Sequence, residues 1–357
     1  MTNLFQRSKD IILENQNSSG GYIASPNFPT YHFSWFRDNS FIAYSMNTIG
    51  EHHSANEFHQ WAAENILKRE DIIQRAIQKT QNGLPLDEQD ILHTRYGLTG
   101  NVSDEDWPNF QLDGFGTWLW ALAEHQKLSG LQASSITLQA ADLLAQYLDA
   151  LWHLPCYDCW EEFPKKIHTY TLAAIYAGLN ADIEGIKGKY KQQLAEISSF
   201  IIKNAVIEGH FTKFVGSEEV DASLIGVSVP YNLVAPKDPL MINTVKEIEK
   251  KLNRGGGLHR YPTDTYYGGG EWVLLTAWLG WYYLKVGEHH KARQALSWVE
   301  DQANDEDHLP EQVPNTLNDK SFYQYWEDRW GGIASPLLWS HAQYIILYKT
   351  LNEIDGL

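Results

Sequence analysis

Residues 271–303 read EWVLLTAWLGWYYLKVGEHHKARQALSWVEDQA, and this stretch contains the unit from which the fold is built. Helical periodicity predicts one helix over 271–286 and a second over 289–303. The connection VGEHH at 286–290 is short enough only for a tight turn. The apolar run inside the first helix is too short to span a bilayer. The stretch therefore predicts a helical hairpin outside any membrane.

The same helical pattern recurs along the chain, and strand-like alternation is scarce. Further helices are predicted over 4–15, 38–49, 54–79, 112–128, 134–152, 167–179, 182–204, 237–252 and 334–351, with a short apolar piece at 221–229. Tight turns roughly alternate with long loops at 16–37, 80–111, 153–166, 253–270 and 304–333. This alternation predicts an all-α ring of helical hairpins over residues 1–357, one domain with its active site in the long loops at one end.

Composition and charge limit the class of partner. The formal net charge is −17, which opposes binding to nucleic acid and to anionic membrane surfaces. Two cysteines do not make a disulfide framework, and the N-terminus has no signal-peptide core. We therefore expect a cytoplasmic protein that binds a neutral or cationic small molecule. The sequence gives no indication of the oligomeric state.

Aromatic residues are unusually numerous, with 14 Trp, 19 Tyr and 13 Phe. Many of them stand beside Gly, Asp, Glu or Arg and not inside apolar runs. Aromatic side chains in such surroundings indicate ligand contacts, and sugar rings stack well on Trp and Tyr.

The stretch YHFSWFRDNSF at 31–41 places Trp35, Arg37 and Asp38 just before a helix. Asp38 could cap that helix, or form a surface ion pair with Arg37. Alternatively, the three residues belong to a binding site. This stretch alone does not separate the readings.

The stretch WPNFQLDGFGTWLW at 107–120 repeats this arrangement with Trp107, Gln111 and Asp113. Asp113 is again a plausible helix cap. Two stretches with an aromatic, a polar group and then a helix start favour a shared pocket.

The stretch LHRYPTDTYYGGGEW at 258–272 is rich in glycine but does not match a phosphate-binding loop. Arg260 and Asp264 could hold sugar hydroxyls through charge-assisted hydrogen bonds.

The stretch CYDCWEEF at 156–163 admits metal, thiol or carboxylate chemistry. A metal site at Cys156 and Cys159 would need a second ligand pair, which is absent from the sequence. A thiol redox pair would need a βαβ setting, which is also absent. We therefore expect packed thiols, and neither a metal nor a cofactor.

Carboxylate chemistry remains for Asp158, Glu161 and Glu162. Crowding and burial against Trp160 would raise a carboxyl pKa, as a general acid requires. A distant carboxylate could then act as base, and glycoside hydrolysis uses such a pair. Glu311, in the partly apolar setting LPEQV, differs from the solvated acidic run that precedes it.

Five motifs together resemble glycoside hydrolase family 15, the glucoamylase family, in family order over nearly the whole chain. They are Tyr31 with SWFRD, W-x-x-x-Q-x-D-G at 107–114, YDCWEE at 157–162, RYPTDTYYGGGEW at 260–272, and LPEQ at 309–312 with PLLWSHA at 336–342. The resemblance implies an (α/α)6 barrel, a six-hairpin toroid. It also implies an inverting exo-hydrolase that releases β-glucose from non-reducing ends of α-glucans.

The resemblance also implies roles for individual residues. Glu161 matches the catalytic acid and Glu311 the catalytic base, while Arg37, Asp38 and Arg260 match residues that grip the terminal glucose. Pocket walls and flanking carboxylates are implied for Tyr31, Trp35, Trp107, Asp158, Trp160, Glu162, Tyr266 and Trp272. For Asp113, Asp264 and Tyr266 a structural role fits their motifs equally well.

The chain departs from familiar members in leaving no room for an N-terminal β-sandwich or a starch-binding module. We therefore expect a short α-glucan oligosaccharide as substrate. Isomaltose, dextran ends or trehalose are alternatives within the enzyme class, because the residues that grip glucose would be shared. A non-catalytic glucan-binding barrel is the alternative outside it.

Overall fold

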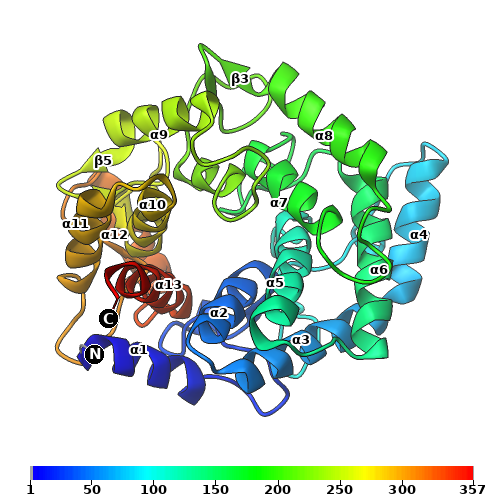
Figure 1. The fold of residues 1–357 in the computed structure, drawn as a ribbon, viewed down its shortest axis with the longest axis horizontal. Coiled ribbons are helices and arrows are strands. Elements are labelled where there is room, and N and C mark those ends of the chain that lie inside the picture. Colours follow the sequence, from blue (N-terminus) through cyan, green and yellow to red (C-terminus); the bar gives the residue numbers. More distant parts are fainter. Residues whose placement is uncertain (1–2, 357) are drawn as a thin grey trace.

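The computed structural model describes residues 3–356, and its helices form a closed ring (Figure 1). The α-helices are α1 (Asn3–Glu14), α2 (Phe36–Thr48), α3 (His52–Leu67), α4 (Glu70–Gln81), α5 (Asp113–Ser129), α6 (Ser135–Leu151), α7 (Thr169–Leu179), α8 (Lys191–Asn204), α9 (Pro239–Leu252), α10 (Val273–Val286), α11 (His289–Glu300), α12 (Ser321–Trp330) and α13 (Leu338–Asp355). The 3-10 helices are η1 (Pro29–Tyr31), η2 (Glu88–Asp90), η3 (Ala222–Val227) and η4 (Tyr266–Gly268). The strands are β1 (Ser34–Trp35), β2 (Arg95–Tyr96), β3 (Val206–Ile207), β4 (His210–Phe211), β5 (Asn253–Arg254), β6 (Gly257–Leu258), β7 (Glu271–Trp272) and β8 (Gln312–Val313).

The helices form two concentric layers. The inner layer runs α2, α5, α7, η3, α10 and α13, each packed against the next until α13 returns to α2. The outer layer consists of α1, α3, α6, α8, α9 and α11, with α4 outside α6. This arrangement confirms the predicted (α/α)6 barrel, in which the apolar piece predicted at 221–229 is the short inner helix η3.

The hairpin of α10 and α11 shows how sequence determines the layer. Every residue of α10 from Val273 to Leu284 is buried, so this helix is apolar on all sides and belongs inside. In α11 only Ala292, Ala295 and Val299 are buried, the single apolar stripe of an outer helix. Gly287 ends α10 in the left-handed conformation, with φ 90°, and allows the tight turn.

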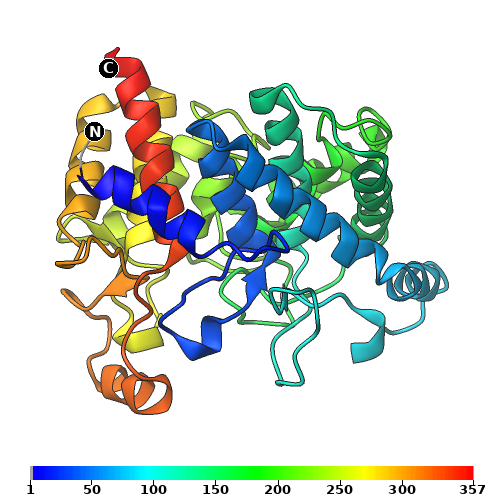
Figure 2. The same cartoon turned by 90° about the horizontal axis from the view of Figure 1, so that it is seen from below.

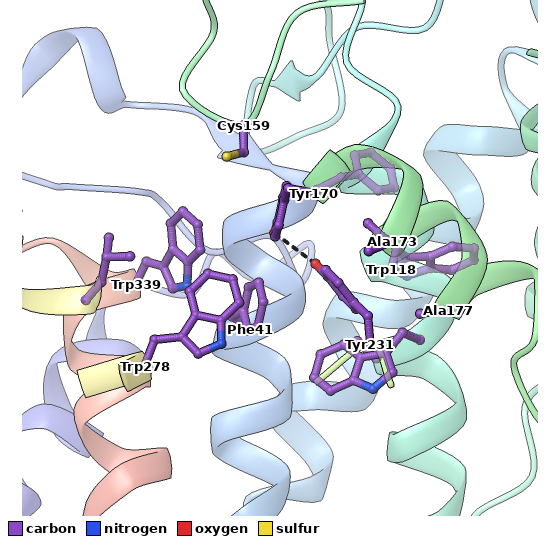
Figure 3. Packing of buried hydrophobic residues seen from close by; sticks show 14 of the residues in the cluster. Phe41, Trp118, Cys159, Tyr170, Ala173, Ala177, Tyr231, Trp278 and Trp339 are labelled. Atoms are coloured by element: carbon purple, nitrogen blue, oxygen red, sulfur yellow. Dashed lines mark hydrogen bonds between the residues drawn. The ribbon is translucent and has the colours of Figure 1, made fainter. Parts of the chain in front are cut away.

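The barrel interior is filled by aromatic side chains from several inner elements (Figure 3). The ring of Phe41 lies 5.4 Å from that of Trp339 and 5.1 Å from that of Trp278, and Tyr170 and Tyr231 share a hydrogen bond of 2.8 Å. Trp339 also lines a cavity at the end of the barrel that carries the long loops. The core therefore forms the floor of that cavity.

Short antiparallel ladders position the loops around the cavity. Trp35 pairs with Arg95 between β1 and β2, and Trp272 pairs with Gln312 between β7 and β8. These ladders lie at the end of the barrel from which the long loops and α12 project, opposite the chain termini (Figure 2). Each pair fixes a site residue or the neighbour of one.

Three expected elements differ from the structure. The helix predicted over 54–79 is broken at Arg69, whose guanidinium bonds the carbonyl oxygens of Asn65 and Gly100. The helix predicted over 182–204 begins only at Lys191, because Gly185 and Gly188 adopt left-handed backbone. The loop predicted over 304–333 contains α12, none of whose residues is fully buried, although Tyr323, Trp326 and Trp330 form a half-buried stripe packed against the core.

Within residues 3–356, no helix combines the length and the apolar character needed to cross a membrane.

Candidate active site

A cavity of about 380 Å³ opens at the loop end of the barrel. It brings together nearly all the residues singled out in the sequence. Those that line it are Tyr31, Trp35, Arg37, Asp38, Trp107, Trp160, Glu161, Glu162, Arg260, Tyr266, Trp272 and Glu311. Of the residues singled out, Asp158 does not line the cavity, and neither do Gln111, Asp113 and Asp264.

Glu311 lies in the deep part of this cavity and is only 4 % exposed. The β7–β8 pairing holds its backbone, since its carbonyl oxygen accepts the amide hydrogen of Val273 at 3.2 Å. Its Oε1 accepts a hydrogen bond of 3.0 Å from the hydroxyl of Tyr31. No donor in the described part of the chain reaches its buried Oε2. Burial raises the pKa of Glu311 to about 8, although the Tyr31 hydrogen bond and Arg260 oppose the shift.

Glu161 sits on a tight turn with φ 69°, in the left-handed region that non-glycine residues rarely adopt. Its amide donates to the carbonyl oxygen of Asp158 at 2.9 Å. Its Oε1 accepts hydrogen bonds from Trp35 Nε1 at 2.8 Å and from Gln111 Nε2 at 3.1 Å. Within residues 3–356 its Oε2 has no hydrogen-bond donor, so that oxygen remains available to a ligand.

The two glutamates are connected through one pair of aromatic rings. Tyr31 bonds Glu311, Trp35 bonds Glu161, and the two rings meet edge-to-face at 5.6 Å. Glu161 and Glu311 therefore face one cavity from different loops, each with one oxygen anchored and one free.

Arg37 lies buried beneath the cavity in a cluster of acceptors. Its Nη1 donates to Gln111 Oε1 at 2.9 Å and to Asp113 Oδ2 at 3.1 Å, and its Nε lies 3.5 Å from Asp38 Oδ2. Burial raises the pKa of Asp38 to about 6, against the lowering effect of Arg37.

Three interpretations of these residues as local structure are wrong. Trp35 is the N-cap of α2, so Asp38 lies inside its first turn. Leu112 is the N-cap of α5, and Asp113 is buried against Arg37. The pair of Arg37 and Asp38 is buried and does not lie on the surface.

Asp264 orients Arg260 and does not reach the cavity. Its carboxylate receives both Nε, at 2.7 Å, and Nη2 of Arg260, and its Oδ1 also accepts the amide of Tyr266 at 2.9 Å. Asp264 is fully buried, so the expectation that it holds sugar hydroxyls is corrected to a supporting role. Burial opposes the charge of Arg260, but Asp264 and Glu162 outweigh it and raise the arginine pKa.

Asp158 shapes the turn that carries Glu161. Its Oδ1 accepts the amide hydrogens of Trp160 at 3.0 Å and of Glu162 at 2.8 Å. It lies behind the cavity, and burial raises its pKa to about 7. The structure thus corrects its prediction as a substrate-binding residue.

Lys213 and Asp221 complete this cluster and were not anticipated from the sequence. Lys213 Nζ lies 3.0 Å from Asp221 Oδ2 and 3.6 Å from Asp158 Oδ2. Asp221 also accepts the indole hydrogen of Trp160 at 3.0 Å. Burial disfavours the lysine charge, but the neighbouring carboxylates raise its pKa overall. A buried cation thus holds Asp158 directly and Trp160 through Asp221.

Three residues of α12, Trp326, Arg329 and Trp330, also line the cavity and were missed. Their sequence signal was the aromatic and charged composition of the stretch SFYQYWEDRW, which resembles that of the other site loops.

Both cysteines are free and buried, as expected, and Cys159 lines the cavity. Burial raises the pKa of the Cys156 thiol to about 12. Among residues 3–356, no group of three or more His, Cys, Asp or Glu is placed to hold a metal ion.

Comparisons with known proteins give a matching family model and several similar chains. The model of the family described as "Glycosyl hydrolases family 15" matches residues 2–349. An isomaltose glucohydrolase from Kribbella flavida is 36 % identical over 98 % of this chain and 92 % of its own length. A solved glycosidase variant in complex with glucose is 36 % identical, with a TM-score of 0.94 over 98 % of this chain and 96 % of that one. Glucoamylase from Hormoconis resinae, 15 % identical, has a TM-score of 0.67 over 97 % of this chain and 73 % of that one, and shares the fold.

Proposed function

The chain belongs to glycosyl hydrolase family 15, and from that premise we propose that it is an exo-acting α-glucosidase. It releases β-glucose from the non-reducing ends of short α-glucans, isomaltose among them. One observation carries the proposal: Glu161 and Glu311 face one cavity, each with one carboxyl oxygen anchored and the other free. The similarity to an isomaltose glucohydrolase supports isomaltose as a substrate.

In this mechanism Glu161 is the general acid. Trp35 and Gln111 hold its Oε1, which leaves Oε2 to deliver a proton to the glycosidic oxygen. The turn shaped by Asp158 fixes the direction of that side chain. Glu162 beside it is held by Tyr261, whose hydroxyl donates at 2.5 Å.

Glu311 is the general base. Tyr31 holds its Oε1, and the free Oε2 takes a proton from the water that attacks the anomeric carbon from the other face. Because water must fit between the base and the sugar, the two carboxyl groups of an inverting site lie about 6.5–9.5 Å apart. Glu311 must be ionised to act, and burial opposes that ionisation.

The closed floor of the cavity supports attack at chain ends. Arg37, Asp38 and Arg260 are each less than one tenth exposed, and they offer charged donors and acceptors to hydroxyl groups. A terminal glucose can reach them, whereas buried aromatic side chains pack the barrel interior below the cavity. Trp160 and Trp272, with rings 5.4 Å apart, supply apolar surface for the sugar ring.

The test is the rate of glucose release from isomaltose, maltose, trehalose and a short dextran. The proposal predicts hydrolysis of at least one of these α-glucosides, with glucose as the first product. Glucose binding without hydrolysis of any of them would contradict the proposal and favour a non-catalytic glucan-binding barrel.

A further inference from the structure

Helix α12 differs from every helix of the barrel layers in its exposure. None of its ten described residues is buried, and it projects beyond the loop end of the barrel (orange in Figure 2). A helix of this length is marginal by itself, so its contacts with other elements must hold it in place.

Aromatic contacts attach α12 to the rest of the site. Trp326 donates from Nε1 to the carbonyl oxygen of Thr265 at 3.0 Å, and its ring meets that of Tyr266 edge-to-face at 5.0 Å. Trp330 lies nearly parallel to Trp107, with ring centroids 6.3 Å apart and an angle of 23°. Trp326 is therefore the anchor, whereas Trp330 and Trp107 together form an aromatic rim contributed by two distant loops.

Arg329 lies at the same rim and has few hydrogen-bond partners. Its Nη1 donates to the hydroxyl of Tyr325 at 3.2 Å, and its guanidinium lies 5.0 Å from the ring of Trp330. Within the described residues it forms no ion pair with a carboxylate, and its side chain is exposed. Its remaining N–H donors can therefore reach hydroxyl groups of a ligand.

The exposure of the lining residues distinguishes the floor of the cavity from its rim. Arg37 and Glu311, at 4 % exposure each, lie on the floor, Glu161 is half-buried, and Arg329 is exposed. A general acid acts on the oxygen between two sugars, so the terminal glucose lies on the floor side of Glu161. The sugar that leaves then lies on the rim side, where α12 ends.

We propose that α12 supplies the binding surface for the leaving sugar, a neutral pyranose. Trp330 with Trp107 provides the apolar platform, and Arg329 donates to hydroxyl groups of that sugar. This inference rests on the proposed function and deepens it, because it assigns selection of the second sugar to a helix outside the barrel layers.

The experiment compares two substrates that share the terminal glucose. One is the disaccharide that the wild type hydrolyses fastest, and the other is α-glucosyl fluoride, which has no second sugar. Trp330→Ala is expected to lower kcat/KM for the disaccharide by about 10-fold and to leave α-glucosyl fluoride hydrolysis unchanged.

Arg329→Met is the second variant, because this side chain is exposed and a substitution there is expected to change stability little. It is likewise expected to lower kcat/KM for the disaccharide and to leave α-glucosyl fluoride hydrolysis unchanged. Phe322→Ala is the matched control, since Phe322 lies on α12 but does not line the cavity, and it is expected to change neither rate.

Equal losses on both substrates in Trp330→Ala and Arg329→Met would assign α12 a structural role and overturn the inference, as would no loss on either. A wild-type protein that hydrolyses neither any disaccharide nor α-glucosyl fluoride would instead contradict the proposed function. The two failures are therefore distinguishable.

Discussion

The two loops that carry Glu161 and Glu311 hold chemically similar side chains in opposite ways. Glu311 is deeply buried, its carboxyl group is hydrogen-bonded to Tyr31 alone among the described residues, and its pKa is raised to about 8. Glu161 is half-buried on a left-handed turn and accepts two indole or amide hydrogens. Burial raises the carboxyl pKa of the proposed base, Glu311, whereas the sequence predicted a raised pKa at the proposed acid.

This difference shows that burial of a carboxyl group and the contacts that hold its loop in place are separate features of the site. The buried carboxylate within residues 156–163 is that of Asp158, whose pKa is raised to about 7 and which holds the turn. The loop of Glu161 is thus fixed by a buried ionic cluster behind it. The loop of Glu311 is fixed by strand pairing, and its carboxyl is buried where it faces the cavity.

The largest expected effect is the loss of activity on replacing either glutamate, and it differs between the two on an activated substrate. Glu161→Gln and Glu311→Gln each remove a proton-transfer group, so kcat on isomaltose is expected to fall by about 100- to 10,000-fold. On α-glucosyl fluoride, Glu161→Gln is expected to recover most activity, because fluoride leaves without a proton. Glu311→Gln should remain inactive on both, and near-normal activity of either variant on isomaltose would reverse the role assignment.

The next effect concerns the cluster behind Glu161. Lys213→Met leaves Asp158 and Asp221 buried without their cation, which is expected to cost about 3–5 kcal/mol in the free energy of unfolding. Urea unfolding would measure the loss, and Lys250→Met on the exposed face of α9 is the control. A loss no larger than that of the control would show that the acidic loop does not depend on this cluster.

A third prediction tests the burial of Glu311 through stability. A carboxyl whose pKa is raised from 4.5 to about 8 in the folded protein destabilises the fold above that unfolded value, and the cost grows until the pH exceeds 8. Glu311→Gln is therefore expected to stabilise the protein at pH 8 more than at pH 5, by about 3–4 kcal/mol. Equal effects at both pH values in thermal unfolding would contradict the raised pKa.

The smallest effect is a shift in pH dependence. Activity requires ionised Glu311, so kcat/KM is expected to rise with pH through a value near 8 and to be lost below it. Tyr31→Phe removes a hydrogen bond that lowers the pKa of Glu311, so this limb should move to higher pH. Tyr176→Phe on α7 is the control. A limb of the pH profile that stays in place or moves to lower pH in Tyr31→Phe would show that Tyr31 does not lower the pKa of Glu311.

Periodicity and loop length were sufficient to predict the ring, because an inner helix such as α10 is apolar on all sides. The motifs predicted the segments of the site, and the cavity indeed joins them. What failed depended on contacts between distant residues. Arg69, at the break between α3 and α4, bonds Gly100, and Trp35, at the N-cap position of α2, pairs with Arg95.

Lys213 illustrates the same limit for the site. A single lysine in a loop reads as exposed, because lysine is almost never fully buried unless it is paired. Its partners Asp158 and Asp221 come from separate segments, so only the fold reveals the pairing. Helix α12 was not predicted for a different reason, since its stripe of Tyr323, Trp326 and Trp330 is only half-buried and lies among charged and polar residues.

The central claim is that Glu161 and Glu311 act from opposite sides of one glucose and invert its anomeric centre. Proton NMR of the first turnover products of isomaltose, recorded before mutarotation, tests it most directly. The account predicts that the signal of β-glucose grows first and that of α-glucose follows only by mutarotation. Initial release of α-glucose would contradict the account.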